Sequence, residues 1–104
     1  MDIHYMADIK GGLRVLHPSQ GVTISGCLNA GKNLSLVGGN VIGISKRCVK
    51  NQFVVGDNIK LGANACIIGP LMLGDNVEIG ASACVTKDFL EKNSKLVGVP
   101  AKPI

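Results

Sequence analysis

Aliphatic residues recur at every sixth position through the second half of this chain, with Gly, Asn, Asp or other small residues between them. A second set of mostly apolar residues follows, four positions after each member of the first. The two sets are Val55, Leu61, Ile67, Leu73, Ile79 and Val85, and Ile59, Ala65, Leu71, Val77, Ala83 and Phe89. A period of six fits neither a 3.6-residue helix nor a simple two-residue alternation. It predicts a short strand followed by a tight corner, which Gly or Asn supplies.

The same ladder runs upstream in two shifted phases, Ile3-Ile9-Val15 and Ile24-Ala30-Leu36-Ile42. The first shift needs three extra residues and contains His17. The second, between Ile42 and Val55, is thirteen residues long instead of twelve and holds Gln52. Register shifts in a repeat mark loops pushed out of the stack, and such loops usually lie on the binding face.

Three strand-and-corner units make one triangular turn of about 18 residues, and successive turns stack at the parallel-strand spacing of roughly 4.8 Å. We therefore predict a single all-β solenoid domain over residues 1–104, with four to five turns in residues 3–90 and a C-terminal tail over residues 91–104. Only one ring of aliphatic side chains is buried per turn in such a fold. The composition agrees, because 46% of the residues are hydrophobic while the chain has two Phe, one Tyr and no Trp.

Composition also narrows the possible location and partners. No stretch approaches the roughly 20 apolar residues of a membrane helix, and the first residues do not read as a secretory signal. We therefore expect a cytoplasmic protein that binds no membrane and whose four cysteines are free thiols. These are Cys27, Cys48, Cys66 and Cys84, and no Cys or His spacing predicts a metal site.

The net charge is +4, and the densest basic patch is Lys46, Arg47 and Lys50. This patch is interpreted either as a solvated face or as a site for an anionic small molecule. Nucleic acid is not expected as a partner, because no basic run is interleaved with aromatic residues for bases to stack on.

The hexapeptide pattern resembles the left-handed parallel β-helix acyltransferases over nearly the whole chain. Two C-terminal motifs strengthen the resemblance. Gly98-Val99-Pro100-Ala101-Lys102 is similar to the G-x-P-A-[KR] ending of many acetyl-CoA-dependent members, and Val85-Thr86-Lys87-Asp88 is similar to the V-x-K-D segment before it. The resemblance implies a left-handed β-helix that uses acetyl-CoA.

His17 is the candidate general base, because His usually performs this role at neutral pH and the other histidine, His4, lies within the regular ladder. Asp2-Ile3-His4 and Leu16-His17-Pro18-Ser19-Gln20-Gly21 resemble the D-I-H and D-H-x-T-G motifs of serine acetyltransferases, whose second His is the base. The spacing from Asp2 to His17 matches that of the family's orienting Asp and its base. A carboxylate at this place fixes the imidazole tautomer and favours the imidazolium.

The resemblance also implies the binding residues for acetyl-CoA. Ala63 and Ala81, eighteen residues apart and hence stacked, would contact the pantetheine arm through their backbones. Thr86, Lys87 and Lys102 would lie near the nucleotide phosphates. In the family the cofactor lies between neighbouring prisms of a trimer, so a homotrimer is expected. Backbone N–H groups at the corner formed by residues 38–40 are candidates for holding the oxyanion.

The sequence also departs from the serine acetyltransferase pattern. Leu16 replaces the Asp before the base and Gln20 replaces Thr, while Gln52 stands where the family has a second active-site His that helps hold the amino acid. The expected activity is therefore O-acetylation of a small molecule or a sugar or polysaccharide precursor. Serine O-acetylation, sugar N-acetylation and a non-catalytic β-helix interaction module stay open as alternatives.

The stacked pair Cys66 and Cys84 raises one further alternative, an acyl-cysteine intermediate. Each of these residues comes just before an inward aliphatic residue, where small residues are routine, and neither has a His near it in sequence.

Overall fold

The computed structural model describes residues 2–49 and 51–104, so Lys50 of the predicted basic patch lies outside the described residues. The described chain forms short strands and one turn of 3-10 helix, η1 (Pro18–Gln20), between β3 and β4. The strands are β1 (Asp2–Ile3), β2 (Asp8–Ile9), β3 (Arg14–Val15), β4 (Val22–Ile24), β5 (Asn29–Ala30), β6 (Ser35–Leu36), β7 (Asn40–Ile44), β8 (Val54–Val55), β9 (Lys60–Leu61), β10 (Cys66–Gly69), β11 (Met72–Leu73), β12 (Glu78–Ile79), β13 (Cys84–Val85), β14 (Lys95–Val97) and β15 (Lys102–Pro103).

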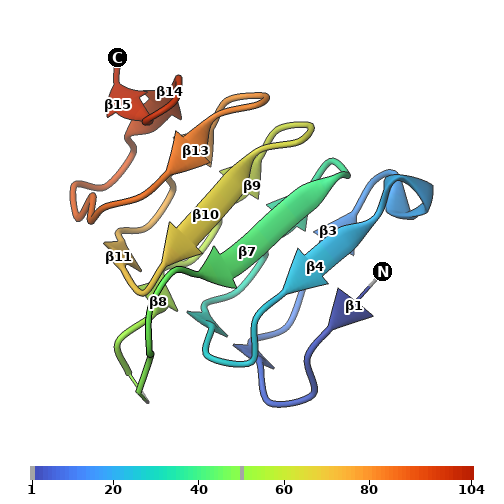
Figure 1. Cartoon of the computed structure of the whole chain (residues 1–104). Helices are drawn as coiled ribbons and strands as arrows, with labels where there is room; N and C mark the ends of the chain where they lie inside the picture. Colours follow the sequence, from blue (N-terminus) through green and yellow to red (C-terminus); the bar gives the residue numbers. More distant parts are fainter. Residues whose placement is uncertain (1, 50) are drawn as a thin grey trace.

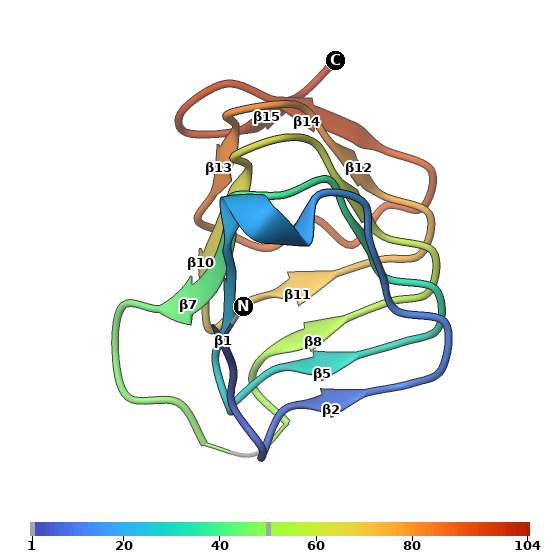
Figure 2. The ribbon, with the colours of Figure 1, turned by 90° about the vertical axis from the view of Figure 1, so that its right-hand side faces the viewer.

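These strands form the three faces of a prism. The first sheet has the order β1-β4-β7-β10-β13, the second β2-β5-β8-β11, and the third β3-β6-β9-β12-β14-β15. The chain visits the three sheets in turn and then starts again one layer further along, which makes about four turns (Figure 1). Figure 2 shows β2, β5, β8 and β11 stacked in this order on the second face. Pairing is parallel except between β14 and β15, which confirms the predicted parallel solenoid.

The predicted ladder residues line the inside of the prism. In the first sheet Ile24, Ile42, Ile67 and Val85 pair in one register, and each is at most 2% exposed. Both downstream sets are buried throughout, apart from Phe89, which is partly buried and packs against the core. Residues of the first turn, such as Ile3, are only partly buried because a neighbouring turn covers just one side of them.

Asparagines form the corner between the second and third sheets, as the sequence predicts. Asn33, Asn58 and Asn76 have φ values of 63°, 59° and 59°, a left-handed conformation that Asn tolerates better than most residues. The Asn33 amide donates to Asn58 Oδ1 at 3.0 Å, and the Asn58 amide donates to Asn76 Oδ1 at 3.0 Å. Each side chain therefore holds the corner of the next turn in register.

Two insertions interrupt the ladder, one of the predicted size and one not. Ile3 pairs with Ile24, twenty-one residues later, so the first insertion has the three extra residues expected. Ile42 pairs with Ile67, twenty-five residues later, so the second insertion adds seven residues to a turn of eighteen. The prediction of a single extra residue is wrong, because Cys48 stands six residues after Ile42 and imitates the next step of the ladder.

Candidate active site

His17 lies at the corner where the third sheet passes into the first, and we call this edge of the prism the His17 corner. Its backbone N–H donates to Val37 O at 2.8 Å, so the residue stacks on the corner of the next turn. The 3-10 turn η1 starts at the following proline, and its Gln20 N–H donates to His17 O at 3.1 Å. The His17 side chain is exposed, as expected of a residue in an insertion outside the ladder.

Gly38 allows the His17 loop to pack closely on the turn below. A Cβ atom at this position would lie 2.8 Å from His17 O and 3.0 Å from Gln20 Oε1. Gly38 also has a φ of 146°, which L-residues with a side chain rarely adopt. Position 38, against which the His17 backbone packs, therefore favours glycine for two reasons: a Cβ atom would clash there, and the φ angle is positive.

Asp2 begins the first sheet and pairs with Thr23 of β4, the strand that follows the His17 loop. Asp2 and His17 thus lie at the two ends of the first turn, and both side chains are exposed. The side-chain hydrogen bonds and ion pairs found among residues 2–49 and 51–104 include none between them. The orienting role of Asp2 therefore stays a prediction.

The glycine corner next to His17 is organised by the side chain of a buried asparagine, Asn40, whose role is not predicted from the sequence. Its Oδ1 accepts the Gly38 N–H at 3.0 Å, and its Nδ2 donates to Gly62 O at 2.9 Å and to Ala65 O at 3.0 Å. At 1% exposure, Asn40 satisfies both ends of its amide inside the corner.

These bonds remove two candidate oxyanion donors. The Gly38 N–H donates to Asn40 Oδ1, and the Gly39 N–H donates to Gly21 O at 2.7 Å. Neither N–H group is free to hold an oxyanion in this structure. The expectation that these two groups serve that purpose is wrong, because the corner uses them for its own stability.

Ala63 and Ala81 stack along the His17 corner, one turn apart. Asn64 N–H donates to Gly38 O at 2.9 Å, and Ser82 N–H donates to Ala63 O at 2.9 Å. The corners of successive turns, from His17 through Gly38 and Ala63 to Ala81, therefore follow one edge of the prism. The predicted vertical alignment of the two alanines is confirmed, while their contact with a pantetheine arm stays a prediction.

A shallow hollow on the third sheet lies beside this edge. Its volume is about 310 Å³, and it extends across successive turns from Leu16, next to His17, through Val37 to Gly62, next to Ala63. Arg14, Lys60 and Glu78 also line it and stand in one register on β3, β9 and β12. These three residues are not predicted from the sequence as part of the site, although their polar positions between the aliphatic steps mark them as outward-facing.

The residues predicted to contact the nucleotide phosphates lie on the last turn. Thr86 and Lys87 follow β13, and the Lys87 ammonium lies 5.7 Å from the centre of the Phe89 ring. Lys102 belongs to β15 on the third sheet, where it pairs with Val97. All three predicted side chains are exposed, and the structure places Lys102 on a different face from the other two.

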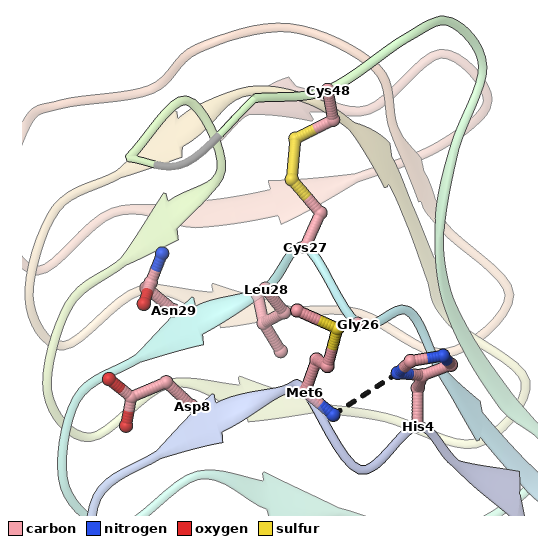
Figure 3. A pocket seen from close by; sticks show the side chains of 8 residues that line it. All are labelled: His4, Met6, Asp8, Gly26, Cys27, Leu28, Asn29 and Cys48. Carbon is pink, nitrogen blue, oxygen red and sulfur yellow. Dashed lines mark hydrogen bonds between the residues drawn. A yellow bond between two sulfur atoms is a disulfide. The ribbon is translucent and has the colours of Figure 1, made fainter.

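A second hollow, of about 540 Å³, opens on the side of the prism where the first sheet passes into the second. His4, Met6, Asp8 and Asn29 line it together with a disulfide between Cys27 and Cys48 (Figure 3). His4 Nδ1 accepts the Met6 N–H at 3.1 Å, which fixes the orientation of the ring. The expectation of free thiols is wrong for this pair, because the second insertion returns Cys48 to the turn that holds Cys27.

Cys66 and Cys84 are free and pair directly in the first sheet, so the predicted stacking of this pair is confirmed. Partial burial and the neighbouring Cys84 thiol raise the pKa of Cys66 to about 11. The Cys66 thiol therefore keeps its proton at neutral pH, and a protonated thiol is a poor nucleophile. This favours a structural role for Cys66 over service as the nucleophile of an acyl-cysteine intermediate.

Neither a membrane helix nor a cluster of metal ligands is found in the described part of the chain. No helix there is both long and apolar enough to cross a bilayer. Likewise, residues 2–49 and 51–104 contain no group of three or more His, Cys, Asp or Glu placed to hold a metal ion.

Comparison with known proteins defines the class of this molecule. No protein-family model matches the chain, and no curated protein sequence matches it. Solved structures do match, and they confirm the predicted fold: the chain is a left-handed parallel β-helix of the hexapeptide-repeat acetyltransferase type.

Within this class the structure is similar to serine acetyltransferases. The enzyme from Neisseria gonorrhoeae matches with 35% sequence identity and a TM-score of 0.88 over 100% of this chain and 40% of that one. The soybean apoenzyme matches with 29% identity and a TM-score of 0.86, over 100% and 43% of the two chains. The Brucella abortus enzyme in complex with coenzyme A matches with 27% identity and a TM-score of 0.88, over 100% and 41%. The chain thus spans about two fifths of the length of these proteins.

Proposed function

We propose that this chain carries an acetyl-CoA-dependent O-acetyltransferase site with His17 as the general base. The observation that carries the proposal is the single edge of the prism on which His17, Gly38, Ala63 and Ala81 follow one another, beside a hollow that extends in the same direction. An extended thioester arm lying along this edge brings its acetyl group to the imidazole. One similar structure contains coenzyme A, which supports the choice of donor.

The proposed reaction is direct transfer between two bound substrates. His17 removes the proton from the acceptor hydroxyl, and the oxygen attacks the thioester carbonyl of acetyl-CoA. The C–S bond then breaks, and the imidazolium gives its proton to the departing thiolate. Asp2, at the other end of the same turn, is proposed to orient the imidazole and stabilise its charged form. Holding both substrates on one rigid face supplies a large part of the rate.

The acceptor is proposed to be a hydroxyl of a small molecule or of a sugar or polysaccharide precursor. One similar enzyme was solved in complex with serine, which keeps serine as the second candidate. Gln52, however, is predicted to stand where the family has its second His, and its Oε1 accepts the Val49 N–H at 3.0 Å. Its side chain is thus engaged within its own loop, which supports an acceptor other than an amino acid.

A homotrimer is part of the proposal. The outward face of the first sheet carries apolar side chains: Val41 is 41% exposed, and Ile68 faces the same way in the neighbouring strand. A thin prism also has a high ratio of surface to volume, so association buries surface that a single copy leaves in water. Copies that pack around a three-fold axis would share the grooves between them.

An acceptor screen tests the function. The protein is incubated with acetyl-CoA and a panel of sugars, amino sugars and serine, and free CoA thiol is detected as it forms. We expect turnover with hydroxyl-bearing sugars and less with serine. No thiol release with any acceptor, together with no saturable binding of CoA at millimolar concentration, would favour the non-catalytic interaction module instead.

Replacing Lys102 by Ala tests the proposed donor site separately. The proposed lysine–phosphate contact is a charge-assisted hydrogen bond, and its loss weakens binding of acetyl-CoA. The Michaelis constant for acetyl-CoA should therefore rise by about tenfold while the turnover number changes little. Lys95→Ala is the matched control, because Lys95 is also an exposed lysine on the third sheet. An unchanged Michaelis constant in the Lys102 variant would make this lysine ordinary surface charge.

A further inference from the structure

The Cys27–Cys48 disulfide links two parts of the chain that the strand pairing does not join directly. Cys27 lies in the corner between β4 and β5, in the second turn of the prism. Cys48 lies in the second insertion, residues 45–53, which leaves the prism after β7 and returns at β8 in the third turn. The disulfide therefore folds this insertion back over the turn before its own.

Apart from the disulfide, few hydrogen bonds hold the described residues in the middle of the insertion. Ser45 N–H donates to Gly69 O at 2.8 Å where the insertion begins, and Phe53 is fully buried where it ends. Between these two points, the backbone and amide hydrogen bonds found in the described part of the insertion join Gln52 to Val49, and the contact with the prism is at the disulfide itself, where Val49 O lies 3.7 Å from Cys27 Sγ. Both cysteines are partly buried against the core, and the bond between them is the covalent anchor of the segment.

The anchored insertion separates two hollows on the same side of the molecule. On one side the disulfide itself forms part of the wall of the hollow that contains His4 and Asp8 (Figure 3). On the other side Lys46, Arg47 and Gln52 line a hollow of about 480 Å³ opposite Asp88. Release of the insertion changes the walls of both hollows at once.

We propose that the Cys27–Cys48 disulfide is a redox-sensitive latch that fixes the described residues of the insertion, 45–49 and 51–53, to the prism in the oxidised protein and frees them in the reduced one. The reductant is a dithiol. One of its thiolates attacks a disulfide sulfur, its second thiol resolves the mixed disulfide, and the products are two protein thiols and an oxidised, disulfide-bonded reductant. Both cysteines lie at the wall of an open hollow, so a small dithiol can reach them.

The remaining cysteines make a natural comparison within the same molecule. Cys66 and Cys84 lie on β10 and β13, and their backbones are fixed by the strand pairing of the first sheet. A change at this pair leaves the insertion where it is. The latch therefore belongs to the pair that spans an insertion, and the pair within the sheet serves as its control.

Limited proteolysis with trypsin tests the latch without reference to any catalytic activity. Lys46 and Arg47 are exposed cleavage sites inside the insertion, and Lys60 and Lys95 are exposed sites on strands of the third sheet. The peptides are identified by mass spectrometry, with and without dithiothreitol. We expect reduction to speed cleavage after Lys46 or Arg47 by about tenfold or more, since local opening governs cleavage, and to leave cleavage after Lys60 and Lys95 unchanged.

Two variants complete the test. Cys48→Ser should be cut in the insertion at the fast rate whether or not reductant is present, whereas the Cys66→Ser, Cys84→Ser double variant should behave as the unmodified protein does. Equal cleavage rates in the two redox states would overturn the latch. Faster cleavage at all four sites together would overturn it as well, because the disulfide would then hold up the whole fold. If dithiothreitol reduced the disulfide only after denaturation, that result would also overturn the latch.

Discussion

Replacing His17 by Ala is expected to lower the turnover number by about 100-fold or more, because general-base catalysis by a positioned side chain contributes an effect of this size. The Michaelis constant for acetyl-CoA should stay almost unchanged, since the proposed donor contacts lie further along the prism at Ala63 and Ala81. The exposed side chain makes little contribution to folding, so the melting temperature should also be maintained. Steady-state kinetics with the best acceptor from the screen measure the first two quantities.

His4→Ala is the matched control for this experiment. His4 is the other histidine of the chain, it is also exposed, and it faces the hollow beside the disulfide. This variant should keep its turnover number. Added imidazole should restore part of the activity of the His17 variant and have no effect on the His4 variant. Retained turnover without His17 would remove that residue from its proposed role.

Replacing Phe53 by Ala is expected to lower the free energy of unfolding by about 3–5 kcal/mol, the usual range for truncating a buried aromatic residue. Phe53 is fully buried in a core that is otherwise aliphatic. A Cβ atom on Gly69 would lie 2.9 Å from the Phe53 ring, so the ring packs directly against the backbone of that glycine. The Phe53 carbonyl also accepts the Asn29 N–H at 2.9 Å, which ties the end of the second insertion to β5.

Phe89→Ala provides the comparison, because Phe89 is the other phenylalanine and is only partly buried. Phe89→Ala should lower the free energy of unfolding by clearly less than Phe53→Ala does. Urea denaturation at one fixed protein concentration measures both, since the stability of an oligomer depends on concentration. Equal losses for the two variants would mean that Phe53 contributes no more to the core than a residue at its margin.

The regular part of the fold is predictable because six-residue spacing leaves few alternatives. Ile67, Leu73 and Ile79 face inward for the same reason: each stands one strand and one corner after the previous one. The left-handed conformation of the asparagine corners is equally local, since Asn tolerates it better than most residues do. Both features depend only on residues that are near in sequence.

The length of the second insertion is harder to predict, because the six-residue spacing continues into the insertion. Cys48 falls six residues after Ile42, as an inward residue would. Sequence spacing does not distinguish a half-buried cysteine in a strand from one that turns back to a disulfide. The pairing with Cys27 depends on where the insertion folds in space, and this follows from the register between turns.

The chemistry of the His17 corner shows the same limit. The exposed position of His17 and the stacking of Ala63 on Ala81 follow from the repeat and its first interruption. The hydrogen bond of the Gly38 N–H does not follow from the repeat, because its acceptor is the side chain of Asn40. Asn40 in turn has to be buried to reach Gly62 O and Ala65 O, and burial of one polar residue among many in a corner is a property of the assembled turns.

A consequence for self-association follows from the reversal at β15. A stack of parallel strands ends in an open edge, which another molecule can extend by adding a strand of its own. In the third sheet β15 runs antiparallel to β14 and occupies this edge, and one of its two residues is Pro103, which has no N–H group to donate. This rim of the third sheet is therefore a poor template for end-to-end fibre growth.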